Sequence, residues 1–373
     1  MPENHVIKIV HLFDEYPVFY QPYIPPVINK LRDNPNLDIE VVVFNGTKSK
    51  EVSKLPNYYK RKVIEKIHYF FCKSNLKLNL AEIQFLKKNV AIVHIQHSYL
   101  FSKVLGLLNM DSSQRPKIVI TLRGGDTYVK PWVNKKWRNF YKKYGNKVDS
   151  FVVMSNHQKK YLNNKWKVPE NRIKVIPISF GEKFSVSPKR PDKKIIRIAS
   201  VFRMCWEKNI DGNLRIIKEL IQNGFPVRYD LYGDGPDLGQ VWYLIDKYKL
   251  TNYVHCHGRI SHKELKMKLI NSDFLIQLSH SEAFPTSVLE AQSIGIPALV
   301  SNAGGLPESI IPNKTGYSIE AFDTIKGAYL LEKLWTNSDL YFQFSLNAIS
   351  NSHKKYSTEK EIEKLNKLYK TII

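Results

Sequence analysis

The stretch DFLIQLSHSEAFPTSVLEAQSIGIPALVSNAGG (residues 273–305) contains two apolar runs with a helix-forming segment between them. Both runs, DFLIQLSHS and IPALVSNAGG, are rich in consecutive apolar residues, as strands buried on both faces are. The segment TSVLEAQSIG is expected to form a helix that begins near Thr286 and stops at Gly295, and Pro297 opens the second strand. We therefore predict a strand–helix–strand unit with parallel strands.

The same alternation of strands and helices extends along the chain. In the first half, the expected strands are VIKIVHLF, DIEVVVFN, VAIVHIQHS, PKIVITLRG and DSFVVMSN. In the second half, IIRIASVF, VRYDLYGDGP and NYVHCHGRI precede the stretch quoted above. Strands that alternate with helices form doubly wound parallel sheets. The predicted fold is therefore α/β, with two Rossmann-like doubly wound domains that face each other across a cleft.

A polar segment between the two series marks the expected domain boundary. SFGEKFSVSPKRPDKK, residues 179–194, has two prolines, one glycine and five lysines or arginines, which is typical of a linker. The length of 373 residues is enough for two domains. We predict an N-terminal domain over residues 1–182, a linker over 183–194, and a second domain over 195–352. A C-terminal helix over 353–373 is expected to pack back on the first domain.

Charge and cysteine content limit the possible partners and compartment. The chain has 57 lysines and arginines against 34 acidic residues, a formal charge of +23, which implies an anionic partner. No recognised nucleic-acid-binding motif is present, so we expect phosphorylated ligands or a lipid surface, and no nucleic acid. The three cysteines are far apart in sequence, which argues against a zinc site or a disulfide framework. With no signal peptide and no apolar run of transmembrane length expected, a cytoplasmic location is predicted.

Two basic segments also contain many aromatic residues. Between Lys48 and Lys88 there are 11 basic and 3 acidic residues, and this region includes PNYYKRKVIEKIHYFFCK. The second segment is YVKPWVNKKWRNFYKKYGNK, residues 128–147. This composition suits a helix that lies on an anionic bilayer, which would make the protein peripheral on the inner face of the cytoplasmic membrane. The alternative is a solvated basic face with its aromatic side chains in the core.

Two glutamates in the first stretch are candidates for ligand binding. Glu282 is expected in the loop after the strand, and Glu290 about one turn into the helix. Ligands of open α/β sheets bind at the carboxyl ends of the strands, and a helix start offers N–H groups to an anion. Because Pro285 has no N–H, the expected donors are those of Thr286, Ser287 and Val288. A nucleotide diphosphate fits this pattern, with phosphates at the helix start, ribose hydroxyls on one carboxylate and another hydroxylated group on the other.

Here the sequence resembles a known family. EAFPTSVLE, residues 282–290, resembles the E-x7-E motif of the retaining GT-B glycosyltransferases of family 4. The resemblance extends to further motifs in the same order between about residues 195 and 320. They are the phosphate-binding stretch SVFRMCWEKNIDGNL, the strand and turn YDLYGDGP, the base-binding loop VHCHGRISHKEL and the glycine-rich turn GGLPESI.

The resemblance implies roles for residues of the second domain. Arg203 and Lys208 would neutralise the diphosphate of the leaving nucleotide, so that no metal ion is required. Glu282 would face the hydroxyls of the donor sugar, and Glu290 would accept from the ribose. The remaining donor-binding residues, in addition to the three at the helix start, would be Gly258, Arg259, Ile260 and Phe284. Asp234 is expected to serve turn geometry.

The first half of the chain resembles the family more loosely. AIVHIQHSYL resembles a strand that ends in a histidine, here His97, and PKIVITLRGGDTY resembles the family's HG-x-D turn. Arg123 stands where histidine is frequent, followed by Gly124, Gly125 and Asp126. His97, Arg123 and Asp126 would line the cleft near the acceptor and the reacting carbon, and Arg123 would bind an acceptor phosphate.

The N-terminal region also departs from the family. FDEYPVFYQPYI occupies the place of the glycine pair that often lines the donor phosphates, and the usual GVD after RIKVIPISFGEKF is missing. The N-terminal stretch is closer to branches of the family that make surface polysaccharides. His157, Cys205 and Cys256 are expected to be structural.

The resemblance therefore implies an enzyme of the hexosyltransferase class. It would move a sugar, with retention of configuration, from a nucleotide-diphosphate sugar to an acceptor hydroxyl, with UDP favoured and GDP possible. A lipid-linked or polysaccharide acceptor in cell-envelope glycan biosynthesis is expected, with no cofactor and no metal. One alternative is a nucleotide-sugar epimerase of the same fold, which would convert its donor without an acceptor. The other is a non-catalytic protein that binds polyanions or nucleic acid, which would bind nucleic acid in a salt-dependent manner.

Overall fold

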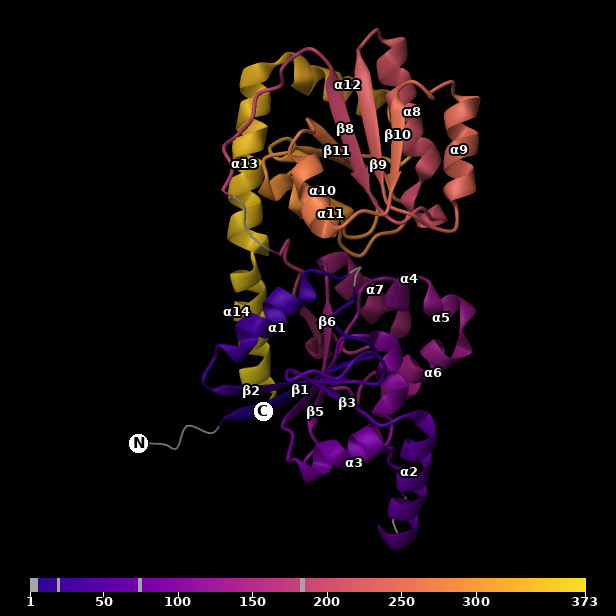
Figure 1. Ribbon diagram of the computed structural model, residues 1–373, viewed down its shortest axis with the longest axis vertical. Helices are drawn as coiled ribbons and strands as arrows, with labels where there is room; N and C mark the ends of the chain where they lie inside the picture. The colour runs from indigo at the N-terminus through magenta and orange to yellow at the C-terminus, as the bar shows by residue number, and fades with distance from the viewer. Residues whose placement is uncertain (1–5, 19–20, 73–75, 182–184) are drawn as a thin grey trace. The chain divides into compact units, whose positions relative to one another are not determined.

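The structure is a computed structural model, and it describes residues 6–18, 21–72, 76–181 and 185–373. The chain forms two compact units (Figure 1). The first comprises Met1–Pro177 together with Glu361–Ile373, and the second comprises Ile178–Lys360. Each unit is built around one parallel sheet, so the predicted α/β fold with two Rossmann-like domains is confirmed.

The first unit contains a seven-stranded sheet with the order β3-β2-β1-β4-β5-β6-β7. Its strands are β1 Ile7–Phe13, β2 Leu37–Val43, β3 Val52–Lys54, β4 Ile92–Ile95, β5 Lys117–Thr121, β6 Ser150–Val153 and β7 Ile173–Val175. The strand order reverses between β1 and β4, which pair in parallel. That reversal brings the loops after β1 and β4 to one point at the carboxyl edge of the sheet.

The helices of the first unit alternate with these strands along the chain. They are α1 Ile24–Arg32, α2 Tyr58–Cys72, α3 Leu80–Lys87, α4 Gly125–Tyr128, α5 Lys130–Val133, α6 Lys135–Tyr144 and α7 Asn156–Trp166, with short 3-10 turns η1 Ser98–Lys103, η2 Leu107–Asn109 and η3 Glu170–Arg172. Side chains from η1, α3, α6 and α7 pack with those of β1, β4, β5 and β6 in one buried cluster. The last helix of the chain, α14 Thr358–Ile372, also contributes to this unit, since Tyr369 Oη lies 2.7 Å from His94 Nδ1 of β4.

The second unit contains a six-stranded sheet with the order β10-β9-β8-β11-β12-β13. Its strands are β8 Ile196–Val201, β9 Val227–Tyr232, β10 Val254–Gly258, β11 Phe274–Gln277, β12 Ala298–Ser301 and β13 Gly316–Ile319. Its helices are α8 Ile210–Gln222, α9 Leu238–Lys247, α10 His262–Leu269, α11 Thr286–Ser293, α12 Thr324–Thr336 and α13 Ser338–Tyr356, with 3-10 turns η4 Trp206–Lys208 and η5 Leu306–Ser309. Helices α8, α9 and α12 pack on one face of the sheet, and α10 and α11 pack on the other. The strand order reverses between β8 and β11.

Three short strands were not predicted, namely β3, β7 and β13. Each has three or four residues and lies at an edge of its sheet. An edge strand pairs on one side only, so its sequence need not be continuously apolar. The pattern of a buried strand is therefore absent from these segments.

The boundaries of the units differ from the expected domain limits. Of the expected linker, residues 183 and 184 lie outside the described residues, and 185–194 belong to the second unit. There the Lys189 amide donates to Ser345 Oγ of α13 over 2.9 Å, and Arg190 Nη1 lies 2.6 Å from Asp339 Oδ1. The expected C-terminal helix is divided, because α13 continues to Tyr356 in the second unit whereas 361–373 belong to the first.

Candidate active site

The candidate site of the second unit lies where the order of its strands reverses. Chain segments leave the carboxyl ends of the neighbouring strands β8 and β11 at this point. The first carries Arg203 and Lys208, and the second carries Glu282. Ligands of doubly wound sheets bind at such a reversal, so the topology itself brings the predicted cations and carboxylate to a binding position.

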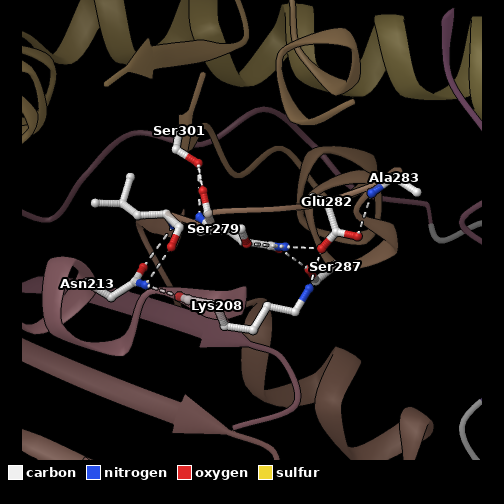
Figure 2. Close-up of polar contacts among 9 residues, drawn as sticks. Lys208, Asn213, Ser279, Glu282, Ala283, Ser287 and Ser301 are labelled. Carbon is white, nitrogen blue, oxygen red and sulfur yellow. Dashed lines mark hydrogen bonds and ion pairs between the residues drawn. The ribbon is translucent and has the colours of Figure 1, made fainter. Parts of the chain in front are cut away.

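Lys208 and Glu282 form an ion pair at the centre of this site. Lys208 Nζ contacts Glu282 Oε2, and their side chains are only 17% and 14% exposed (Figure 2). The same carboxylate oxygen accepts from Gln277 Nε2 over 2.9 Å, and Oε1 accepts from the amide of Ala283 over 3.1 Å. Three donors therefore fix the position of the Glu282 carboxylate.

A second set of hydrogen bonds holds the two loops in place. Asn213 of α8 donates to the carbonyl of Lys208 over 2.9 Å, and its Oδ1 accepts from the amide of Leu278 over 3.1 Å. The Ser279 amide donates to Ser301 Oγ over 2.9 Å, and that hydroxyl donates back to the Ser279 carbonyl over 2.6 Å (Figure 2). Asn213 thus joins the β8 loop to the β11 loop, and Ser301 joins the β11 loop to β12.

Gly304 lets the chain after β12 approach the Glu282 backbone. Its φ is +56°, and a Cβ at this position would lie 2.1 Å from the Glu282 carbonyl oxygen. The amide of the next residue, Gly305, donates to that same carbonyl over 2.8 Å. The last two glycines of the first quoted stretch therefore support the loop that carries the first glutamate.

Helix α11 begins directly after this loop. Its N-cap residue Pro285 makes no side-chain cap hydrogen bond, so the first amides of the helix have no partner from that side chain. Ser287 Oγ donates to Gln277 Oε1 over 2.7 Å, whereas the Val288 side chain is fully buried in the core. Val288 can therefore contribute only its backbone to a ligand. Phe284 is also buried, with its ring 5.4 Å from that of Tyr356.

The second glutamate of the motif, Glu290, has a buried side chain. Glu290 is 6% exposed, and its Oε1 lies 2.9 Å from His262 Nε2 at the start of α10. A buried carboxylate requires a donor or a cation, and His262 is its recorded side-chain partner. The pairing of these residues joins α11 to α10.

The remaining predicted donor-site residues lie in the loops after β8, β9 and β10. Arg203 is exposed, and no ion pair is recorded for it within the described ranges. Gly258 has φ +63°, and its carbonyl accepts from the amide of Gly233 over 2.8 Å. Arg259 Nη2 lies 3.5 Å from Asp234 Oδ2, both side chains being about half exposed, and Ile260 packs against the core. Asp234 Oδ1 also accepts from the amide of Gly235 over 2.7 Å, in keeping with a turn.

In the first unit, Asp126 is a buried acceptor with four donors. Its carboxylate accepts from Ser98 Oγ over 2.6 Å, from Thr127 Oγ1 over 3.3 Å, and from the amides of Arg123 and Gly124 over 3.0 Å each. These bonds occupy the carboxylate and tie the turn after β5 to η1. The geometry therefore gives Asp126 a positioning role in this unit.

His97 lies at the strand-order reversal of the first unit. Its Nδ1 accepts from the amide of Asp14 over 3.2 Å, and its Nε2 lies 3.0 Å from Gln21 Oε1, so Nε2 carries the proton. Burial, with Arg123 nearby, lowers the pKa of His97 to about 4. His97 is therefore neutral at pH 7, with both ring nitrogens engaged.

Arg123 lies near His97 and retains donor capacity. Its Nη2 donates to Gln96 Oε1 over 3.1 Å, and its guanidinium lies 5.6 Å from the centre of the Tyr23 ring. Its Nε is buried and has no recorded hydrogen-bond partner in the described part of the chain. A buried donor without a partner, in the loop after β5, is consistent with a role in ligand binding.

The residues expected to be structural have ordinary environments. His157 Nδ1 lies 2.9 Å from Tyr128 Oη. Burial raises the pKa values of the Cys205 and Cys256 thiols to about 11 each, so neither is a thiolate at neutral pH. Within residues 6–18, 21–72, 76–181 and 185–373, no group of three or more His, Cys, Asp or Glu side chains could hold a metal ion.

Four residues of the candidate site were not singled out from the sequence: Gln277, Asn213, Ser301 and His262. Gln277 is a polar residue at the end of an otherwise apolar strand, which is the one signal that could have identified it. The other three act through contacts between segments that lie far apart in the chain. The predicted residues His97, Arg123 and Asp126 belong to the first unit, and the other predicted site residues belong to the second.

Comparison with known proteins gives matches over most of the chain. A family model described as "Glycosyl transferases group 1" matches residues 180–351, and one described as "Glycosyltransferase Family 4" matches residues 31–178. The Schizosaccharomyces pombe "Phosphatidylinositol N-acetylglucosaminyltransferase gpi3 subunit" is 27% identical over 148 residues, which are 39% of this chain and 32% of that protein. The Bacillus anthracis "N-acetyl-alpha-D-glucosaminyl L-malate synthase" is 22% identical over 303 residues, which are 77% of this chain and 76% of that protein.

The match to the phosphatidylinositol N-acetylglucosaminyltransferase subunits spans about a third to a half of their length. Among solved structures, a variant of S. aureus TarM in complex with fondaparinux, alpha-GlcNAc-glycerol and UDP has a TM-score of 0.75 at 15% identity. The alignment covers 97% of this chain and 99% of that chain, so the two share a fold. The two family models, which together match residues 31–178 and 180–351, confirm the family expected from the motifs.

Proposed function

This chain belongs to the group 1 glycosyl transferases, of the GT-B, family 4 type, and we propose that it moves a sugar from a nucleotide-diphosphate sugar to an acceptor hydroxyl. The observation that carries the proposal is the Lys208–Glu282 pair at the strand-order reversal of the second unit. It combines a cation for phosphate and an acceptor for sugar hydroxyls beside the start of α11. A polyanion-binding protein does not require this combination, whereas an epimerase would bind the same kind of donor, and the E-x7-E motif counts against it.

The diphosphate would bind where cations and helix amides converge. Lys208 and Arg203 supply the positive charge, and the amides of Thr286, Ser287 and Val288 supply donors at the start of α11. Charge grows on the leaving phosphate as the glycosidic bond breaks, and preorganised cations stabilise that charge. We therefore propose a reaction that needs no metal ion and no cofactor.

The sugar and the nucleoside would bind on either side of these phosphates. Glu282, fixed by Gln277 and the Ala283 amide, would accept from the donor sugar hydroxyls. Glu290 would accept from the ribose, and the backbone of the β10 loop, Gly258 to Ile260, would lie against the base. UDP is the favoured nucleotide, as in the TarM complex, whereas GDP is the second candidate.

The reaction would retain the anomeric configuration. The bond between the anomeric carbon and the phosphate oxygen breaks, and a bond from the acceptor oxygen to that carbon forms on the same face. The leaving phosphate oxygen takes the proton of the acceptor hydroxyl. The resemblance of the E-x7-E motif to that of retaining enzymes supports this proposed course, and the cations at the proposed phosphate position fit it.

The acceptor would bind to the first unit and would be a lipid-linked or polysaccharide glycan of the cell envelope. Arg123, with its buried Nε, would contact an acceptor phosphate, and His97 and Asp126 would hold the loops around it. The phosphatidylinositol acceptor named for the gpi3 relative is an example of a lipid acceptor in the family. No helix in the described part of the chain has the length and apolar character needed to span a bilayer. We propose that the protein reaches such an acceptor from the inner face of the cytoplasmic membrane.

Thermal unfolding with EDTA and a panel of UDP, GDP, ADP and CMP tests this function. A ligand that binds only the folded protein raises its melting temperature. At a concentration of 100 times its Kd, it adds about 2.7 kcal/mol to the free energy of unfolding. We expect a selective shift for one diphosphate, abolished by Arg203→Ala with Lys208→Ala. Lys326→Ala with Lys333→Ala, which removes two exposed charges from α12, is the matched control and should keep the shift.

The outcomes separate the proposed function from its rivals. No shift with any nucleotide, together with strong salt-dependent binding of nucleic acid, would favour the polyanion-binding protein. Conversion of the sugar of the donor without any acceptor would favour the epimerase. Transfer to a soluble sugar as readily as to a lipid-linked one would remove the lipid acceptor from the proposal.

A further inference from the structure

Helix α2 packs on the first unit through its more polar face. The half-buried residues of Tyr58–Phe71 are Arg61, Ile64, Glu65 and His68, which lie three and four positions apart on one side of the helix. The Arg61 guanidinium lies 5.1 Å from the centre of the Phe44 ring, and Glu65 Oε1 accepts from the amide of Leu80 over 3.1 Å. Charged side chains thus form the contacts that hold this helix.

The opposite face of α2 is apolar and exposed. Tyr59, Val63, Ile67 and Phe70 follow the same helical spacing, and Tyr59 and Phe70 are 81% and 78% exposed. Phe71, next to this stripe, is 76% exposed. A helix of a globular protein ordinarily turns its apolar stripe to the core, so the amphipathic pattern of α2 is inverted. In Figure 1, α2 extends away from the sheet of its unit.

Helix α6, which forms part of the second basic and aromatic segment, behaves in the ordinary way. Within α6, the side chains of Trp137, Phe140, Tyr141 and Tyr144 are all buried in the core, whereas the lysines face solvent. The core accounts for the aromatic residues of α6, which need no partner. It does not account for those of α2, and exposed apolar patches of this kind mark interaction sites.

Lysines border the apolar stripe of α2 on both sides. Lys66 lies on one side of the stripe and Lys60 on the other, and both are exposed, whereas Lys62, beside Lys66, is paired with Glu65 over 2.7 Å. Aromatic and branched side chains between lysines match a bilayer interface, where rings enter the acyl boundary and ammonium groups meet anionic headgroups. A groove in a protein partner would not require cations on both borders.

We propose that the outward face of α2, defined by Tyr59, Val63, Ile67 and Phe70, docks this chain on an anionic lipid bilayer. The inference rests on the proposed function only for the purpose of the docking, which is to bring the enzyme to a lipid-linked acceptor. The docking itself needs neither donor nor acceptor. It can therefore fail while nucleotide binding stands, and the reverse also holds.

Vesicle co-sedimentation of the full chain, without nucleotide, tests this docking. We expect binding to vesicles that contain about one third phosphatidylglycerol, and binding at least tenfold weaker to pure phosphatidylcholine. Tyr59→Gln with Phe70→Gln should weaken binding to the anionic vesicles at least tenfold. Trp242→Gln with Tyr243→Gln, on the exposed surface of α9, is the matched control and should bind like the parent.

Circular dichroism and the melting temperature of each variant without nucleotide show whether it is folded. Equal binding by the parent and the α2 variant would overturn the proposal, as would an equal loss in the α9 control. Parent chains that sediment as oligomers without lipid, and the α2 variant as monomers, would assign the surface to a second copy instead. A Phe70→Trp chain provides a local measurement, since its added fluorescence should be quenched by brominated acyl chains, and an absence of quenching would contradict insertion of this face.

Discussion

Lys208 and Glu282 form an ion pair across 74 positions of sequence, from the loops that follow two neighbouring strands. The two charges would serve different parts of the donor, Lys208 the diphosphate and Glu282 the sugar. Because both side chains are largely buried, removal of either one leaves the other without its partner. Removal of either residue is therefore expected to disturb the structure of the site as well as its binding of the donor.

Glu282→Gln should lower the turnover number by roughly 10²–10³. The amide keeps the size of the side chain and removes the charge that would accept from the sugar hydroxyls. Initial rates with the nucleotide sugar selected by the melting panel would measure this, alongside the melting shift given by the nucleotide alone. Glu320→Gln, on an exposed residue after β13, is the control, and an equal loss there would contradict the role of Glu282.

Glu290→Gln should weaken binding of the nucleotide by about tenfold or more, because hydrogen bonds to a charged group contribute roughly 1.5–3 kcal/mol. Gln can still accept from His262, so the contact between α10 and α11 is preserved. Titration calorimetry with the selected diphosphate would measure the change. Glu264→Gln, on a half-exposed side chain of α10, should leave the affinity as in the parent, and unchanged affinity in the Glu290 variant would remove the ribose role.

Gly304→Ala should destabilise the second unit by at least about 2 kcal/mol, because a Cβ would collide with the Glu282 carbonyl and the φ of +56° disfavours alanine. Gly239→Ala is the matched control, since nothing lies within 4 Å of a Cβ at that position in α9. The control should be neutral or stabilising by up to about 1 kcal/mol. Urea unfolding of the two variants would compare them, and equal stability would show that the loop adapts.

The sequence was sufficient to predict where the loops of the donor site meet. The alternation of apolar runs and helices predicts parallel strands, whose carboxyl ends share one edge of the sheet, so Arg203, Lys208 and Glu282 could be assigned to that edge. The burial of Glu290 could not be predicted, since helical position alone does not say which face His262 approaches. The hydrogen bonds of the Asp126 carboxylate could not be predicted either, because one of its donors, Ser98, lies 28 residues away and comes close only in the folded chain.

Composition also failed to distinguish the two basic and aromatic segments. Segments α2 and α6 have similar residues, but α6 turns its aromatic side chains to the core and α2 turns them outward. The difference lies in the partners of the polar face, since Phe44 and the Leu80 amide are available to Arg61 and Glu65 of α2. Such partners are set by tertiary structure and leave no local pattern.

The first unit should lose stability as the pH falls below about 6.5. Burial lowers the pKa of His11 to about 3 and that of His94 well below its usual value, and His97 titrates near 4. The unfolded chain binds these protons at higher pH than the folded chain does, so stability rises with pH across this window. Glu82, whose pKa burial raises to about 7, acts in the opposite direction and offsets part of the effect.

His11→Asn isolates one of these groups. With pKa values of about 3 folded and 6.5 unfolded, His11 costs about 2 kcal/mol of stability at pH 5 relative to pH 8, so the variant should have a pH dependence flatter by about that amount. The variant itself is less stable at pH 8, because His11 Nδ1 lies 3.0 Å from Gln96 Nε2 and the shorter side chain fits that contact less well. Hydrogen exchange of the β1 and β4 amides in urea at both pH values would report on this unit. The same change at exposed His280 of the second unit serves as control, and an unaltered slope in the His11 variant would show that this buried imidazole is not what makes the unit sensitive to acid.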